Sequence, residues 1–143
     1  MPVATIDWKN GKIRYIDQRL LPAKVKFVSC SDIRQLWAAI KTLAIRGAPA
    51  IGIAGALGVV LASRRSKGKN FDAFYKDLVS DIRYLASSRP TAVNLFWALK
   101  RMERLASRNS SKPLGAIKAI ILKEALAIIE EDKKSCRAMA RYG

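Results

Sequence analysis

Apolar and polar side chains alternate along the first thirty residues with the period of two that is typical of β-strands. The alternation predicts that Ile13 and Tyr15 share one face of a strand, and that Val25 and Phe27 share one face of the next. An Asn-Gly dipeptide lies between the first two strands and favours a tight hairpin, because both turn positions need positive φ. The pattern therefore predicts a small antiparallel sheet with strands at residues 5–9, 12–17 and 25–30.

After residue 30 the apolar positions recur with a helical period. Ser31 or Asp32 can cap a first helix, whose apolar stripe includes Trp37 and Leu43 and which we expect to end at Gly47. The sequence thus predicts an α+β fold, with a small N-terminal antiparallel β-sheet followed by a bundle of about five helices. The further helices are predicted at residues 49–61, 71–86, 91–107 and 114–141.

The length of 143 residues matches one domain of ordinary size. We expect residues 1–143 to form a single N-terminal domain, with the strands in residues 1–30 and the helices in residues 31–143. The first ten residues lack the apolar segment of a signal peptide, so we expect a cytoplasmic protein.

An uncharged segment at residues 48–62 predicts a buried central helix. It is shorter than the roughly 20 residues that cross a bilayer, so we expect no membrane partner. Gly52, Gly55 and Gly58 recur every third residue along it, and their missing side chains favour the close approach of another helix. We interpret these glycines as packing positions.

Lysine and arginine outnumber aspartate and glutamate by 27 to 11, which gives a net charge of +16. Such a charge attracts nucleic acid, an acidic membrane surface or a phosphorylated ligand. The basic residues are spread over several segments, and Trp37 and Trp97 fall in apolar stretches that we assign to the core. Nucleic acid is therefore possible as a partner but is not favoured.

The chain has two cysteines and no histidine, which excludes histidine-based acid–base chemistry and argues against a zinc site. Cys30 and Cys136 are far apart and belong to no Cys-x-x-Cys pair, so we expect free thiols. We expect no metal.

Two segments place an arginine directly before a predicted helix: Arg46-Gly47-Ala48-Pro49 and Arg89-Pro90-Thr91-Ala92. The unpaired N–H groups of a helix N-terminus favour an anion, and the planar guanidinium matches phosphate oxygens. An arginine that is only solvated, and a structural cap formed by Thr91 with Asn94, are the alternative interpretations.

Three segments closely resemble the amino-terminal part of methylthioribose-1-phosphate isomerases, which share their fold with regulatory subunits of translation initiation factor 2B. They are Ile-Asp-Gln-Arg-Leu-Leu-Pro at residues 16–22, Ile-Arg-Gly-Ala-Pro-Ala-Ile-Gly-Ile-Ala at residues 45–54 and Ser-Arg-Pro-Thr-Ala-Val-Asn-Leu-Phe-Trp-Ala at residues 88–98. The resemblance covers essentially the whole chain.

This resemblance implies an aldose–ketose isomerase of methionine salvage that converts 5-methylthioribose 1-phosphate into 5-methylthioribulose 1-phosphate without a metal or organic cofactor. It implies that Arg46, Gly47 and Ala48 bind the substrate together with Arg89. A translation-factor-like regulatory or binding module, with RNA as a conceivable partner, is the alternative within the same fold.

The resemblance also implies that the family's catalytic cysteine and aspartate belong to a C-terminal Rossmann-like domain that this chain does not reach. We therefore expect no catalytic residue here and no turnover by this chain alone, whether it is a fragment or a natural short protein. Cys136 is interpreted as part of the last helix and Cys30 as a small buried residue. We expect a homo-oligomer, most simply a dimer.

Overall fold

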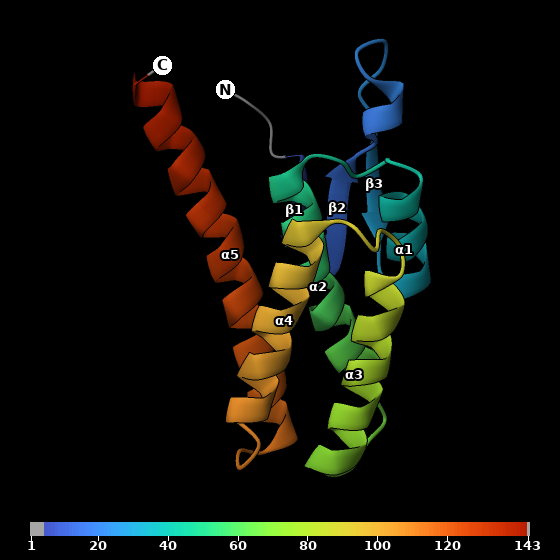
Figure 1. Cartoon of the computed structure of the whole chain (residues 1–143), viewed down its shortest axis with the longest axis vertical. Helices are drawn as coiled ribbons and strands as arrows, with labels where there is room; N and C mark the ends of the chain where they lie inside the picture. Colours follow the sequence, from blue (N-terminus) through green and yellow to red (C-terminus); the bar gives the residue numbers. More distant parts are fainter. Residues whose placement is uncertain (1–4, 143) are drawn as a thin grey trace.

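The computed structural model describes the backbone of residues 5–142 and the side chains of residues 5–135. Within that part of the chain, a three-stranded sheet comes first and five α-helices follow it (Figure 1). The predicted α+β fold is confirmed. The elements are β1 (Ile6–Lys9), β2 (Lys12–Ile16), η1 (Gln18–Leu20), β3 (Phe27–Cys30), α1 (Ile33–Lys41), α2 (Ala48–Arg65), α3 (Phe71–Ala86), α4 (Val93–Arg108) and α5 (Leu114–Tyr142).

The sheet is antiparallel in the order β1-β2-β3, and positive φ angles at Asn10 and Gly11 confirm the predicted hairpin turn. Ile13 pairs with Cys30, and both are buried. Val25 and Phe27, which the alternation predicts to share one face, are both exposed, at 62% and 42%. Val25 precedes β3, and the register of β3 turns Val28 and Cys30 inward, which leaves Phe27 on the outer face.

Helix α1 starts where the sequence predicts and ends sooner. Asp32 caps it by accepting a hydrogen bond from the N–H of Arg34 at 2.6 Å. The predicted end at Gly47 is wrong, because Leu43 adopts a φ of 66° and is 41% exposed. A left-handed residue reverses the chain, so the helix stops at Lys41 and the following segment turns back toward the core.

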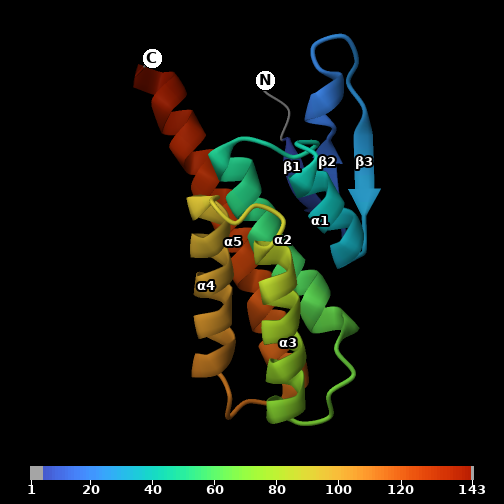
Figure 2. The same cartoon turned by 45° about the vertical axis from the view of Figure 1, so that its right-hand side comes forward.

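Helix α2 is the central element, and it packs against the other four helices and β1 (Figures 1 and 2). Its residues from Ala50 to Ser63 are all buried, which confirms the predicted central helix. A Cβ added to Gly55 would lie 3.0 Å from Leu95 Cδ1 of α4, and one added to Gly58 would lie 2.7 Å from Leu85 Cδ1 of α3. The glycines therefore allow these two helices to approach closely. No helix in residues 5–142 is long and apolar enough to span a bilayer.

Helix α4 faces the core with a stripe that includes Leu95, Leu99 and Met102. Trp97 lies on the opposite side of the helix and is 56% exposed, so its predicted place in the core is wrong. The reason is the angular position of Trp97 around the helix axis, because a residue two positions from both Leu95 and Leu99 lies on the side opposite to theirs. Trp37 is only half-buried, and its indole N–H donates to Ser87 Oγ at 2.9 Å.

Candidate functional site: the starts of α2 and α4

The first turns of α2 and α4 lie side by side at one end of the helical layer (Figure 2). Between them is a hollow of about 320 Å³. Three of the four predicted site residues, Gly47, Ala48 and Arg89, line it. The two segments that the sequence places more than 40 residues apart therefore meet in space. The remaining lining residues are Ile51, Ala92, Val93 and Asn94.

Helices α2 and α4 lack a side-chain cap, whereas Asp32 caps α1 and Asn70 caps α3. The N-cap residues are Gly47 and Ala92, which offer no side-chain acceptor. The N–H groups of the two first turns therefore have no acceptor in an N-cap side chain, and helix N-termini of this kind favour an anion. A structural cap by Thr91 and Asn94 is wrong, because Ala92 occupies the N-cap position.

Gly47 has a φ of 96° and a ψ of 134°. A Cβ at this position would meet nothing within 4 Å, so the need for glycine comes from the backbone conformation. Any other residue would be strained here. The glycine thus sets the direction in which the chain enters α2.

Arg46 is exposed and does not line the hollow. Its Nη2 donates to the carbonyl oxygen of Gln18 at 3.4 Å. The N–H of Gln18 donates to the carbonyl of Ala44 at 2.9 Å, so the η1 turn holds the segment that carries Arg46. The predicted role of Arg46 in binding stays a prediction, as does that of Arg89.

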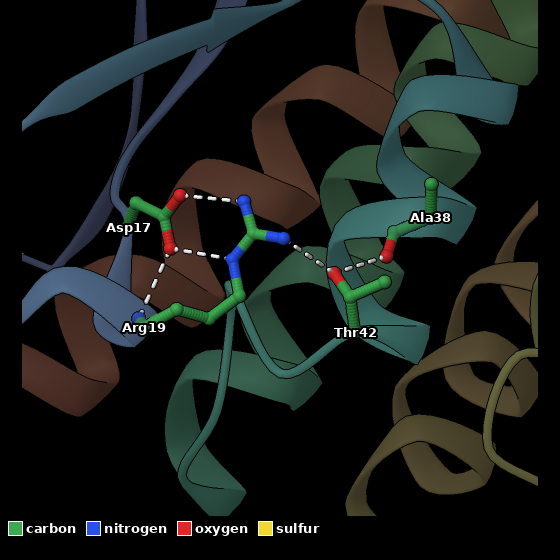
Figure 3. A network of polar contacts seen from close by, with 4 residues as sticks. All are labelled: Asp17, Arg19, Ala38 and Thr42. Atoms are coloured by element: carbon green, nitrogen blue, oxygen red, sulfur yellow. Dashed lines mark hydrogen bonds and ion pairs between the residues drawn. The ribbon is translucent and has the colours of Figure 1, made fainter.

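A buried carboxylate, Asp17, fixes this turn. Arg19 donates to Asp17 Oδ1 from Nε at 2.9 Å and to Oδ2 from Nη2 at 2.6 Å, and its backbone N–H also donates to Oδ1 (Figure 3). Its Nη1 reaches Thr42 Oγ1 at 3.5 Å, and Thr42 donates to the carbonyl of Ala38 (Figure 3). The network therefore joins β2, the η1 turn and the end of α1.

The hydrogen bonds from Arg19 hold the pKa of Asp17 below its ordinary value. Asp17 is 5% exposed, so the ionised carboxylate is buried and fully engaged by its partner. The sequence assigned no role to this pair. The sequence feature that could have indicated this ion pair is an aspartate and an arginine two residues apart, directly after a strand. That pattern is too common to distinguish a buried ion pair from a solvated one.

The residues lining the hollow include no carboxylate, cysteine, lysine or tyrosine. The arrangement can therefore hold and orient an anion, but these residues supply no acid–base pair for proton transfer. Cys30 is buried, as expected, and burial raises the pKa of its thiol. Cys136 lies on α5, and its side chain is outside the described residues.

Residues 44–143 match the model of the initiation factor 2 subunit family. Among curated relatives, the 5-deoxyribose 1-phosphate isomerase of Moorella thermoacetica is 46% identical over 99% of this chain and 40% of its own length. The methylthioribose-1-phosphate isomerase of Geobacter sulfurreducens is 40% identical over 100% of this chain and 41% of its own length. The chain thus spans about two-fifths of these relatives.

Two solved structures are similar to this fold. The 5-methylthioribose 1-phosphate isomerase of Pyrococcus horikoshii has a TM-score of 0.84 and 41% identity, covering 89% of this chain and 36% of that one. The translation initiation factor eIF-2B subunit delta of A. fulgidus has a TM-score of 0.83 and 38% identity, covering 92% and 38%.

Proposed function

The chain belongs to the initiation factor 2 subunit family, and from this membership we propose that it is the substrate-phosphate-binding part of an aldose–ketose isomerase. Relatives that match it at 40% and 46% identity are named as isomerases of a methylthioribose or deoxyribose 1-phosphate. The proposed reaction is the conversion of 5-methylthioribose 1-phosphate to 5-methylthioribulose 1-phosphate in methionine salvage. It requires no cofactor and takes place in the cytoplasm.

The observation that supports this proposal is the meeting of two uncapped helix starts, each preceded by an arginine, at one hollow. Arg89 lines the hollow beside Gly47 and Ala48. A phosphate seated there would accept hydrogen bonds from backbone N–H groups and lie close to a guanidinium, which neutralises its charge. Holding the phosphate places the sugar carbons for the proton or hydride shift, and correct placement can remove roughly 7–11 kcal/mol of a barrier.

The reacting groups belong, in this proposal, to a C-terminal Rossmann-like domain that supplies a cysteine and an aspartate. This chain would then bind substrate without converting it. The complete enzyme is proposed to be a homodimer. Arg46 would complete the site by swinging from Gln18 toward the phosphate, since its guanidinium is exposed and held by a single long hydrogen bond.

Binding of 5-methylthioribose 1-phosphate to this chain, measured by calorimetry, tests the proposal directly. Arg89→Gln should weaken binding about tenfold to a hundredfold, because a hydrogen bond to a charged group contributes about 1.5–3 kcal/mol. Arg83→Gln is the matched control, since Arg83 is exposed on α3 and lies outside the hollow. Equal affinities for the two variants would contradict the site.

Turnover is measured on the protein expressed from the complete native reading frame, by following ketose formation with NMR. We expect activity with methylthioribose 1-phosphate and its loss in Arg46→Ala and Arg89→Ala. An active protein that keeps its rate in both variants would contradict the assigned residues. An inactive one that nevertheless binds the sugar phosphate would contradict the isomerase assignment and leave a binding module.

A translation-factor-like regulatory module is the second candidate. The observation in its favour is the nearly equal likeness to the eIF-2B subunit delta of A. fulgidus, with a TM-score of 0.83 against 0.84 for the isomerase of Pyrococcus horikoshii. The two functions differ in their ligands, so the sugar-phosphate titration separates them. Absence of binding to the sugar phosphate at millimolar concentration would support the regulatory module.

A further inference from the structure

The outward side of α4 carries a row of cations that the proposed sugar-phosphate site does not use. We call Trp97, Lys100, Arg101, Arg104 and Arg108 the α4 outer face. With Ser107 these residues line a shallow hollow of about 410 Å³. No residue of this hollow lines the hollow at the starts of α2 and α4. The two sites are therefore separate.

The cations of this face fall into two groups. Arg101 is held by α5, because it donates to Glu124 at 2.9 Å and to Glu131 at 3.1 and 3.2 Å. Lys100, Arg104 and Arg108 form no ion pair with any side chain in residues 5–135. These three cations can neutralise an external anion without losing a partner inside the described part of the protein.

The spacing of the three cations suits an extended anion. Lys100, Arg104 and Arg108 follow one another every fourth residue, so they lie on one side of the helix about 6 Å apart along its axis. From Trp97 to Arg108 the face extends about 16 Å along the axis. This length exceeds that of a single phosphate and matches a chain of several anionic groups.

Trp97 supplies the second element of such a surface. Its ring is 56% exposed, and the Arg101 guanidinium lies 5.3 Å from the ring centroid. Since Glu124 and Glu131 fix Arg101, the cation–π contact orients the indole beside the cation row. Stacking on an exposed aromatic ring is the common way to hold an unpaired base, whatever its sequence.

We propose that the α4 outer face binds single-stranded nucleic acid. The three unpaired cations contact successive phosphates, and Trp97 stacks on a base. The net charge of +16 draws polyanions toward the molecule. A carboxylate-rich peptide satisfies the cations but has no planar base for the indole, so the exposed tryptophan favours nucleic acid.

The test is fluorescence anisotropy of a labelled single-stranded RNA of mixed sequence, titrated with the chain at several salt concentrations. Binding should weaken linearly on a log–log plot against salt. In the triple variant Lys100→Gln, Arg104→Gln, Arg108→Gln, the slope should fall by about 2, because each single-strand phosphate contact contributes about 0.7. Trp97→Ala should weaken binding at least about fivefold, and Trp97→Phe should restore most of it.

The matched control is Lys67→Gln, Lys69→Gln, Lys76→Gln, which removes the same charge from exposed lysines near the start of α3. This variant should keep a slope close to the wild-type value. Equal losses in both triple variants would mean diffuse attraction and would overturn the assigned face. Poly-glutamate that binds the face as tightly as the RNA, with no effect of Trp97→Ala, would overturn it in favour of an acidic protein partner. Circular dichroism of each variant checks that its helices are retained.

Discussion

A single buried carboxylate, Asp17, ties together residues that are far apart in the sequence. Its oxygens accept hydrogen bonds from the Arg19 side chain, and Arg19 reaches Thr42 at the end of α1. The carbonyl oxygen of the adjacent Gln18 accepts a hydrogen bond from the guanidinium of Arg46, and the N–H of Gln18 donates to the carbonyl oxygen of Ala44. At the scale of residues, the geometry around the candidate site therefore depends on an ion pair that does not touch it.

Asp17 should make the fold sensitive to acid. Its pKa is lowered in the folded state by the hydrogen bonds from Arg19, so the folded protein binds this proton more weakly than the unfolded chain. The resulting stabilisation is fully present above the unfolded pKa of about 4 and is lost as the pH falls through the folded pKa. In thermal melts, Asp17→Asn should lower Tm at pH 7 by several degrees and flatten its decline below pH 4.

The control for this prediction is Asp72→Asn, because Asp72 is exposed on α3 and makes no ion pair with the described side chains. The Tm of the Asp72→Asn variant should decline with falling pH as the wild-type Tm does. An Asp17→Asn melt that follows the wild-type curve at every pH would show that the ion pair contributes nothing to stability.

Helix α2 illustrates how an element is shaped by its neighbours. Its glycines lower its intrinsic helix stability, since each glycine costs roughly 0.5–1 kcal/mol relative to alanine. Their cost is offset by packing, because α3 and α4 approach the bare backbone. The helix exists through tertiary contact more than through local propensity.

Alanine substitutions at Gly58 and Gly52 should separate the effect of helix propensity from the effect of packing. At Gly58 a Cβ would lie 2.7 Å from Leu85 and 2.9 Å from Leu36, both fully buried. Gly58→Ala should destabilise the fold by roughly 1–3 kcal/mol through overpacking. At Gly52 the nearest atom is 3.6 Å away, so Gly52→Ala should be neutral or stabilising by up to about 1 kcal/mol. Urea unfolding measures both, and equal effects would refute this packing account.

At the scale of the whole molecule, the chain carries 27 basic and 11 acidic residues. Ion pairs are few in the described residues: Asp17, Asp81, Glu124, Glu130 and Glu131 take part in them. Most of the positive charge is therefore unpaired there. Mutual repulsion of like charges opposes the compact state.

Salt should therefore stabilise this protein. The screening length falls from about 10 Å at 0.1 M to about 3 Å at 1 M, which weakens repulsion across the surface. We expect Tm to rise by a few degrees when NaCl is raised over that range. The variant Lys67→Gln, Lys69→Gln, Lys76→Gln should start from a higher Tm and gain less. A Tm that falls with salt would mean that the ion pairs outweigh the repulsion.

Part of the candidate site was predictable, because an arginine before a helix is a local pattern. Gly47, Ala48 and Arg89 do line one hollow. The place of Asn94 in the lining of the hollow was not predictable, since the spacing favoured a structural cap with Thr91. The hydrogen bond from Arg46 to Gln18 was not predictable either, because it joins residues 28 positions apart in the sequence.

The sequence by itself determined the fold class, the hairpin, the central helix and the bounds of α3, because periodicity and turn chemistry act over a few residues. Only the tertiary structure decided where α1 ends, which face β3 buries and which side of α4 carries Trp97. These outcomes depend on register and helix phase, where a shift of one residue moves a side chain from core to surface. Only the tertiary structure also decided that the starts of α2 and α4 meet, because helix packing determines this contact and no local sequence pattern encodes it.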